Sequence, residues 1–221
     1  MRRTTMLGTV AVLGLAILSG CNQNTASDTN SAAPQTAANE PAPGSNTEAV
    51  SALQDAVAGG VGAVSAQLTT STKGFVEVAA RGDMHEIEAS KIAVARAQNP
   101  AVKEFAREMI ADHTKTSENL KATLKDSGEN IALPVALDDR HKGMLDNLKG
   151  AAAEDFDNRF IAQQTNAHNE KLILMKGYAE GGDNAALKAL AEKAVPGVQT
   201  HLDKIAEMER AHRTANTQAN R

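Results

Sequence analysis

Apolar residues recur at three- and four-residue steps through most of the chain after residue 74, which is the spacing of one buried helix face. The clearest example begins at Asn99, a capping residue, and Pro100, which suits the first helical position. Its stripe comprises Val102, Phe105, Ala106, Met109, Ile110, Leu120 and Leu124. His113 falls on the same face, and Gly128 follows the last apolar residue as a helix stop. The pattern predicts a long amphipathic helix with a histidine on its buried side.

Four further segments show the same periodicity, at residues 75–98, 138–149, 153–180 and 185–211. Pro196 and Gly197 predict a break or kink inside the last of them. The inner faces of these helices also carry or border on polar residues, namely Glu86, His141, Asp157, His168 and His201. The sequence therefore predicts helices whose buried sides are not purely apolar.

A short internal repeat in the sequence predicts that the long helices form two similar pairs. The pattern of residues 99–106 recurs at residues 184–191, and each copy follows one long helix and begins another. Aromatic residues make up only 2% of the chain and alanine is abundant, which favours closely packed helices over a β-sandwich. We expect an all-α fold, a four-helix bundle with an extra short helix over residues 74–213. Residues 214–221 are expected to form a disordered tail.

The first 20 residues have the features of a bacterial lipoprotein signal peptide. A short basic head precedes an apolar run, Met6 to Leu18, that is too short to span a bilayer comfortably. The sequence Leu-Ser-Gly-Cys at residues 18–21 matches the lipoprotein cleavage box, in which the thiol of Cys21 takes a diacylglycerol; an ordinary secretory signal is the alternative. Asn22 after the cysteine indicates the outer membrane in a Gram-negative host. We expect a lipid anchor in the cell envelope, on the periplasmic face of the outer membrane.

Two segments of different character separate Cys21 from the bundle. Residues 21–46 are rich in Ser, Thr, Asn, Ala and Pro, which predicts a disordered tether with a reach of about 25–30 Å. Residues 47–73 are compatible with a weak amphipathic helix or with a linker. Their apolar residues step like a coiled-coil seam and are Val50, Leu53, Val57, Val61, Val64 and Leu68. Three glycines interrupt this seam, and each destabilises a helix by about 1 kcal/mol relative to alanine. A helix here therefore needs a partner surface, and we expect a protein partner at Val50–Leu68.

The inward-facing histidines carry the argument for function. Helical bundles build metal sites from side chains on facing helices, and imidazole and carboxylate groups suit Fe, Mn, Zn or Cu. The candidate ligands are Glu86, His113, Asp157, His168 and His201, with Asp112 and His141 as secondary candidates. These residues form one site only if they share a level along the bundle, which periodicity does not determine. The alternative is that they hydrogen-bond within the core of a structural or protein-interaction module that holds no metal.

Several other functions are disfavoured. The net charge is −4 and basic residues are interleaved with acidic ones, so no nucleic-acid-binding surface is expected. The sequence has no phosphate-binding loop, dinucleotide-binding glycine pattern or nucleophile elbow. The one cysteine, Cys21, is the predicted acylation site. The sequence therefore favours a non-enzymatic role.

Several short segments together resemble a bacterial family of unknown function, described as predicted outer-membrane proteins with a ferritin-like bundle. These segments are Asp-Met-His-Glu-Ile-Glu-Ala-Ser-Lys at 83–91, Asp-His-Thr at 112–114, Phe-Asp-Asn-Arg-Phe at 156–160, Ala-His at 167–168 and Thr-His-Leu at 200–202. The resemblance extends from about Gly74 to Met208. It implies an envelope location and a ferritin-like fold, and it supplies no established activity. Ferritins and rubrerythrins carry Glu-x-x-His pairs on two core helices, whereas the Glu-x-x-His pair of this chain, Glu209 and His212, lies at a polar helix end. This difference argues against ferroxidase or di-iron peroxidase chemistry.

Overall fold

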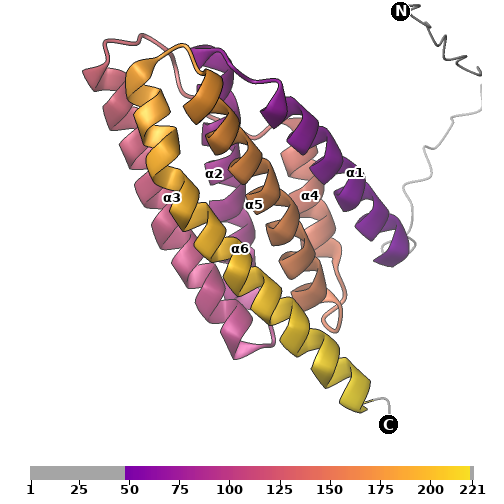
Figure 1. Cartoon of the computed structure of the whole chain (residues 1–221). Helices are drawn as coiled ribbons and strands as arrows, with labels where there is room; N and C mark the ends of the chain where they lie inside the picture. Colours follow the sequence, from indigo (N-terminus) through magenta and orange to yellow (C-terminus); the bar gives the residue numbers. More distant parts are fainter. Residues whose placement is uncertain (1–47, 220–221) are drawn as a thin grey trace, which may run out of the picture. The chain divides into compact units, whose positions relative to one another are not determined.

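The computed structural model describes residues 48–219, so the predicted signal peptide, Cys21 and the tether lie outside the described residues. Within 48–219 the chain forms helices and no strand, which confirms the predicted all-α class (Figure 1). The six helices are α1 (Glu48–Gln67), α2 (Thr72–Arg96), α3 (Pro100–Asp126), α4 (Asp139–Gly150), α5 (Phe156–Gly181) and α6 (Ala185–Ala219).

Two helical hairpins, α2–α3 and α5–α6, form the core of the bundle. The side chain of Asn99 accepts a hydrogen bond from the backbone of Ala101 at 2.9 Å, and Asn184 accepts one from Ala186 at 3.0 Å. The two copies of the internal repeat are therefore two equivalent helix starts, in which an asparagine side chain accepts a hydrogen bond from a free N–H group of the first turn. Helix α2 also packs on α5, and α3 packs on α6.

Helix α6 differs from the expectation at its centre and at its end. It runs through Pro196 as one helix, so the predicted break at this position is wrong. The proline removes one backbone hydrogen bond, but Ala191, Val198 and His201 on either side of it are buried in the bundle. The helix continues to Ala219, through residues that the sequence predicted as a disordered tail.

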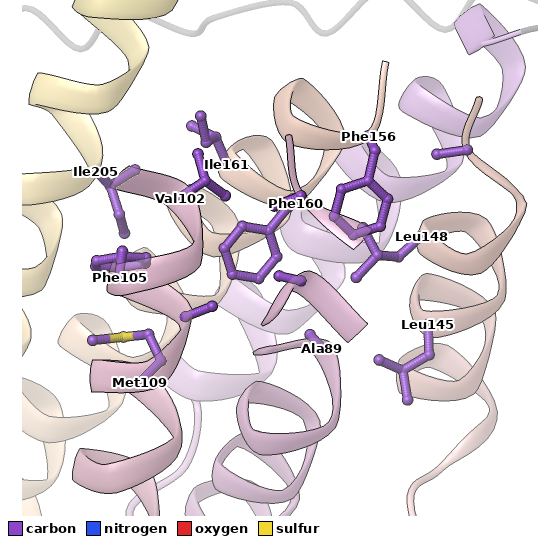
Figure 2. Close-up of a cluster of buried hydrophobic side chains, with 14 residues drawn as sticks. Ala89, Val102, Phe105, Met109, Leu145, Leu148, Phe156, Phe160, Ile161 and Ile205 are labelled. Carbon is purple, nitrogen blue, oxygen red and sulfur yellow. The ribbon is translucent and has the colours of Figure 1, made fainter. Parts of the chain in front are cut away.

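The bundle buries two apolar clusters separated by a polar level. Figure 2 shows the first cluster, which gathers side chains from α2 to α6 and includes Phe105, Leu148, Phe156 and Phe160. The second cluster includes Phe75, Leu124, Leu174 and Tyr178. Between the two, each core helix buries polar residues, which are Asp83 and Glu86 on α2, His113 on α3, Gln164, His168 and Lys171 on α5, and His201 on α6. These polar residues therefore share a level along the bundle.

Helix α1 lies against α5 and α4 (Figure 1). It packs through small and polar residues, which are Ser51, Asp55, Gly59, Gly62 and Ala66. A Cβ atom at Gly59 would lie 2.7 Å from Cγ of Asn166, so the glycine that weakens the helix also permits its close approach to α5. Among the described helices, α1 alone is long and apolar enough, by length and composition, to cross a membrane. Its apolar seam faces away from the bundle, and the predicted protein partner stays a prediction.

Candidate metal centre

His113 of α3 presents one ring nitrogen to Asp83 and the other to the interior. Its Nδ1 lies 2.8 Å from Oδ1 of Asp83. Because an ionised carboxylate only accepts hydrogen bonds, Nδ1 carries the proton and Nε2 carries a lone pair. This Nε2 is buried and has no hydrogen-bond partner within the described part of the chain. In the neutral ring, His113 therefore aims an acceptor nitrogen into the core.

The same reasoning applies to His168 of α5 and His201 of α6. Nδ1 of His168 lies 3.0 Å from the carbonyl oxygen of Gln164, and Nε2 of His201 lies 2.9 Å from Oδ2 of Asp112. Both acceptors require a ring proton, which leaves lone pairs on Nε2 of His168 and Nδ1 of His201. These two nitrogens lie 3.2 Å apart, although neither has a proton to give to the other.

The three histidines thus bring ring nitrogens close together in the core. The ligand atoms of His113, His168 and His201 all lie within 4.8 Å of one another, and all three residues are buried. At the usual metal–nitrogen distance of about 2.0–2.1 Å, two neighbouring ligand atoms lie about 3.0–3.4 Å apart. The 3.2 Å between His168 and His201 falls in this range. A bound cation is the simplest partner for such a set of acceptors.

The electrostatics of the histidines favour a metal ion over a proton at neutral pH. Burial lowers the pKa of His168 to about 4, and neighbouring His113 and His201 act in the same direction, although Glu86 opposes them. Burial likewise lowers the pKa of His201, despite its contact with Asp112. Neutral imidazole is the form that binds metals, so these ligands need not lose a proton at pH 7.

Behind His113, Asp83 forms a buried network. Its carboxylate accepts hydrogen bonds from the ammonium group of Lys171, from Thr116 at 2.9 Å and from Ser117 at 3.3 Å. Burial alone would raise the pKa of Asp83, but Lys171 and His113 hold it well below its usual value. An ionised carboxylate that fixes the far nitrogen of a histidine is the usual support of a metal-binding ring.

Glu86 adds a buried acidic group close to His113 and His168. It is 2% exposed, and neither carboxylate oxygen has a hydrogen-bond partner among residues 48–219. Nδ1 of His85 lies 3.7 Å away, too far for a hydrogen bond. Burial opposes ionisation of Glu86, but His85, His168 and His113 outweigh it and lower its pKa to about 2. Glu86 stands outside the 4.8 Å group, so it is a neighbour of the centre and a candidate further ligand.

A cavity of about 280 Å³ adjoins the centre. His113 and His201 contribute to its wall, together with Asp112, Lys115 and Lys193. Much of the remaining wall is apolar, from residues such as Phe75, Leu120, Met175, Leu190 and Val198. A small molecule that enters this cavity reaches two of the three convergent histidines.

Of the other predicted ligands, two lie elsewhere. Asp157 accepts hydrogen bonds from the backbone of Gln98 and Asn99, so it closes the α2–α3 turn at the end of the bundle. His141 donates from Nδ1 to Asp138 at 2.8 Å and accepts from Arg140 at 2.9 Å. Both ring nitrogens of His141 are therefore engaged outside the centre.

Asp112 lies next to the centre, where it accepts a hydrogen bond from Nε2 of His201 and orients that ring. Glu108, Asp112 and His201 form a second close group, but Glu108 is paired with Lys204. Asp83 and Lys171 were not predicted from the sequence as site residues. Asp83 lay on the apolar stripe of its helix, and a charged residue at such a position is the signal that identifies it.

The fold and this centre define a class of protein, a helical bundle whose core carries a cluster of histidines and acidic groups. The chain belongs to the family described as Domain of unknown function (DUF4142), whose model matches residues 59–208. This match confirms the membership in a family of unknown function that the sequence motifs indicated. No curated protein and no solved structure matches the chain.

Proposed function

We propose that this protein binds one divalent transition-metal ion through His113, His168 and His201, with Glu86 as a further ligand or a counter-charge. One observation carries the proposal: three imidazole lone pairs converge within 4.8 Å, and each ring has its other nitrogen fixed by an acceptor. Three carboxylates, on Asp83, Glu86 and Asp112, lie around the centre, and the ammonium group of Lys171 pairs with Asp83. This excess of acidic groups favours a cation.

The donor set indicates the class of metal. Neutral imidazole suits Zn, Fe, Mn and Cu, whereas Mg and Ca prefer oxygen ligands throughout. Three nitrogens from a protein leave room for a further ligand on most of these ions. The adjoining cavity of about 280 Å³ supports access by a small molecule, and so favours a centre that exchanges ligands over a closed structural one.

Metal titration of the purified chain tests the proposal. After treatment with a chelator, the protein is titrated with Co²⁺ and Zn²⁺, and the Co²⁺ absorption bands report nitrogen ligation. We expect one ion per chain, with at least tenfold weaker binding in His113→Ala. His141→Ala is the matched control, because His141 is also a buried histidine but has both nitrogens engaged elsewhere.

Two results would contradict the metal proposal. Absence of uptake by the unmodified chain would leave a structural or protein-interaction module whose histidines only fix the packing of the helices. Equal losses in His113→Ala and His141→Ala would show that the effect arises from general destabilisation.

We also propose that the protein is a lipoprotein of the cell envelope, anchored through Cys21 on the periplasmic face of the outer membrane. The basic head, short apolar core and Leu-Ser-Gly-Cys box support this. Labelling of cells with a fatty-acid analogue is expected to mark the protein and not the Cys21→Ala variant. An unlabelled protein in the soluble fraction would contradict the anchor.

A further inference from the structure

An apolar stripe on α1 stands out on the surface of the bundle. In the described part of the chain, seven large hydrophobic side chains are exposed, and one of them, Val135, lies in the α3–α4 loop. The other six form what we call the α1 stripe: Val50, Leu53, Val57, Val61 and Val64 of α1, and Leu68 directly after its end. Their exposed fractions run from 44% to 77%. A contiguous patch of this kind marks an interaction site.

The orientation of α1 is fixed by its opposite face. Asp55 is 3% exposed and accepts hydrogen bonds from Arg159 at 3.2 Å and Gln163 at 2.8 Å. Glu48, the other charged residue of α1, also pairs with Arg159. If the helix were rotated to bury its apolar side, Asp55 would lose these partners. The α1 stripe therefore faces outward, because the polar side of α1 binds the bundle. The residues flanking the stripe on the exposed face between 49 and 68 carry no charge.

The spacing of the α1 stripe suits a flat surface. Its steps repeat every eleven residues, since Val50, Leu53 and Val57 are followed by Val61, Val64 and Leu68. This repeat corresponds to about 3.67 residues per turn, close to the 3.6 of a straight helix, so the stripe follows one line along the axis. A left-handed coiled coil requires a seven-residue repeat instead.

The dimensions and chemistry of the stripe argue against a protein partner. Eighteen residues of helix are about 27 Å long and one helix diameter is about 10 Å, which gives a footprint of roughly 300 Å². A stable protein interface buries about 800 Å² on each side. Helix partners also use flanking charges to set register and partner choice, and these are absent along the stripe.

The position of α1 in the chain points to a lipid surface. Residues 22–47, a stretch of 26 residues, separate Cys21 from the first residue of α1. Even fully extended, such a stretch spans no more than about 90 Å. With Cys21 acylated, as proposed above, α1 is the first described helix after the anchor, and the connection raises its local concentration at the bilayer.

We propose that the α1 stripe rests on the lipid bilayer, with α1 parallel to the membrane plane and the rest of the bundle above it. Helices of this type place their apolar face at the boundary of headgroups and acyl chains, and their affinity scales with the apolar area. The stripe and the acyl anchor are then two moderate attachments that act together. The inference depends on the proposed lipid anchor only for its cellular setting.

Vesicle sedimentation tests the stripe without the anchor. The chain from residue 21 onward, carrying Cys21→Ser, is mixed with vesicles of phosphatidylethanolamine and phosphatidylglycerol at about three to one. We expect it to sediment with the vesicles, and the triple variant Val57→Gln, Val61→Gln, Val64→Gln to bind at least tenfold more weakly. Val135→Gln is the control, because Val135 is an even more exposed apolar side chain that lies away from α1, and its loss is expected to leave binding unchanged.

A site-specific probe gives an independent measurement. In the Cys21→Ser chain a single new cysteine, Val61→Cys or Val135→Cys, carries an environment-sensitive fluorophore. Vesicles are expected to shift the emission of the probe at 61 to the blue and to leave the probe at 135 unchanged. The proposal is overturned if the Cys21→Ser chain stays in the supernatant, or if both probes respond alike. It is also overturned if the triple substitution abolishes a concentration-dependent dimer, which would assign the stripe to a second copy.

Discussion

Replacing Asp83 by asparagine tests the ion pair that supports the metal centre. Asp83 is 2% exposed, and its carboxylate accepts from Lys171 and from His113. Lys171 is itself only 9% exposed. Asparagine keeps the size of the side chain but removes its charge, so Asp83→Asn leaves a buried ammonium group without a counter-charge. Breaking a buried pair at one partner costs about 3–5 kcal/mol, a large part of the 5–15 kcal/mol that stabilises a typical domain.

A double-mutant cycle separates this electrostatic cost from a loss of packing. Lys171→Met removes the other charge and keeps an unbranched side chain of similar length. The double variant buries neither charge, so it is expected to be at least about 2 kcal/mol more stable than the sum of the single losses. The free energies come from urea unfolding followed by circular dichroism at pH 7, in the presence of a chelator.

Two outcomes would refute the reasoning. A loss below about 1 kcal/mol in Asp83→Asn would show that Lys171 reaches water or another partner easily. Strict additivity of the two substitutions would show that the two groups do not interact in the folded protein.

Two further predictions concern the pH response and the packing of α1. Burial, with His85 and Arg140 nearby, lowers the pKa of His141 from 6.5 to about 4, so the unfolded chain binds a proton that the folded chain does not between these values. The contribution of His141 to the free energy of unfolding is therefore complete above pH 6.5. It is lost as the pH falls towards 4, and this loss amounts to about 3 kcal/mol. In metal-free protein, His141→Asn should reduce the total fall in unfolding free energy by that amount, and an unchanged fall would contradict the assignment. Gly62→Ala should destabilise by about 1–3 kcal/mol because its Cβ would clash with Glu170, whereas Gly60→Ala, with open space around it, should stabilise by up to about 1 kcal/mol. Equal shifts in thermal unfolding would show that α1 does not pack as described.

The helices themselves were predictable because their signals are local. Apolar periodicity and the asparagines at 99 and 184 placed α3 and α6 at their observed starts. Within each hairpin, the residues that share a level were also readable, from their distance to the turn. Glu86 lies 13 residues before Asn99, and His113 lies 14 residues after it. In a helical hairpin, residues equally far from the turn lie at the same height.

Other features depend on tertiary partners and could not be predicted in this way. Asp157 has the inward phase of a ligand, but it occupies the first turn of α5, where the free N–H groups of the neighbouring α2–α3 turn attract it. The ring nitrogen that each histidine offers is set by Asp83, Gln164 and Asp112, which belong to three different helices. Periodicity identifies the face of a helix, and it identifies neither the depth nor the protonated nitrogen.

The outward direction of the α1 stripe has a similar origin. By periodicity alone, the apolar residues of α1 are the expected buried face. Burial of Asp55 with Arg159, and the close approach permitted by Gly59, decide the opposite orientation. A charged residue with a buried partner outweighs an apolar stripe because its exposure would leave that partner unpaired.

The central claim is that His113, His168 and His201 together hold a metal ion. Its most direct test is anomalous diffraction at the zinc edge from crystals of the chain grown with Zn²⁺. We predict one strong anomalous peak at about 2.0–2.1 Å from Nε2 of His113, Nε2 of His168 and Nδ1 of His201. A structure with zinc bound only at surface carboxylates, and with these three rings in direct hydrogen bonds to one another, would contradict the claim.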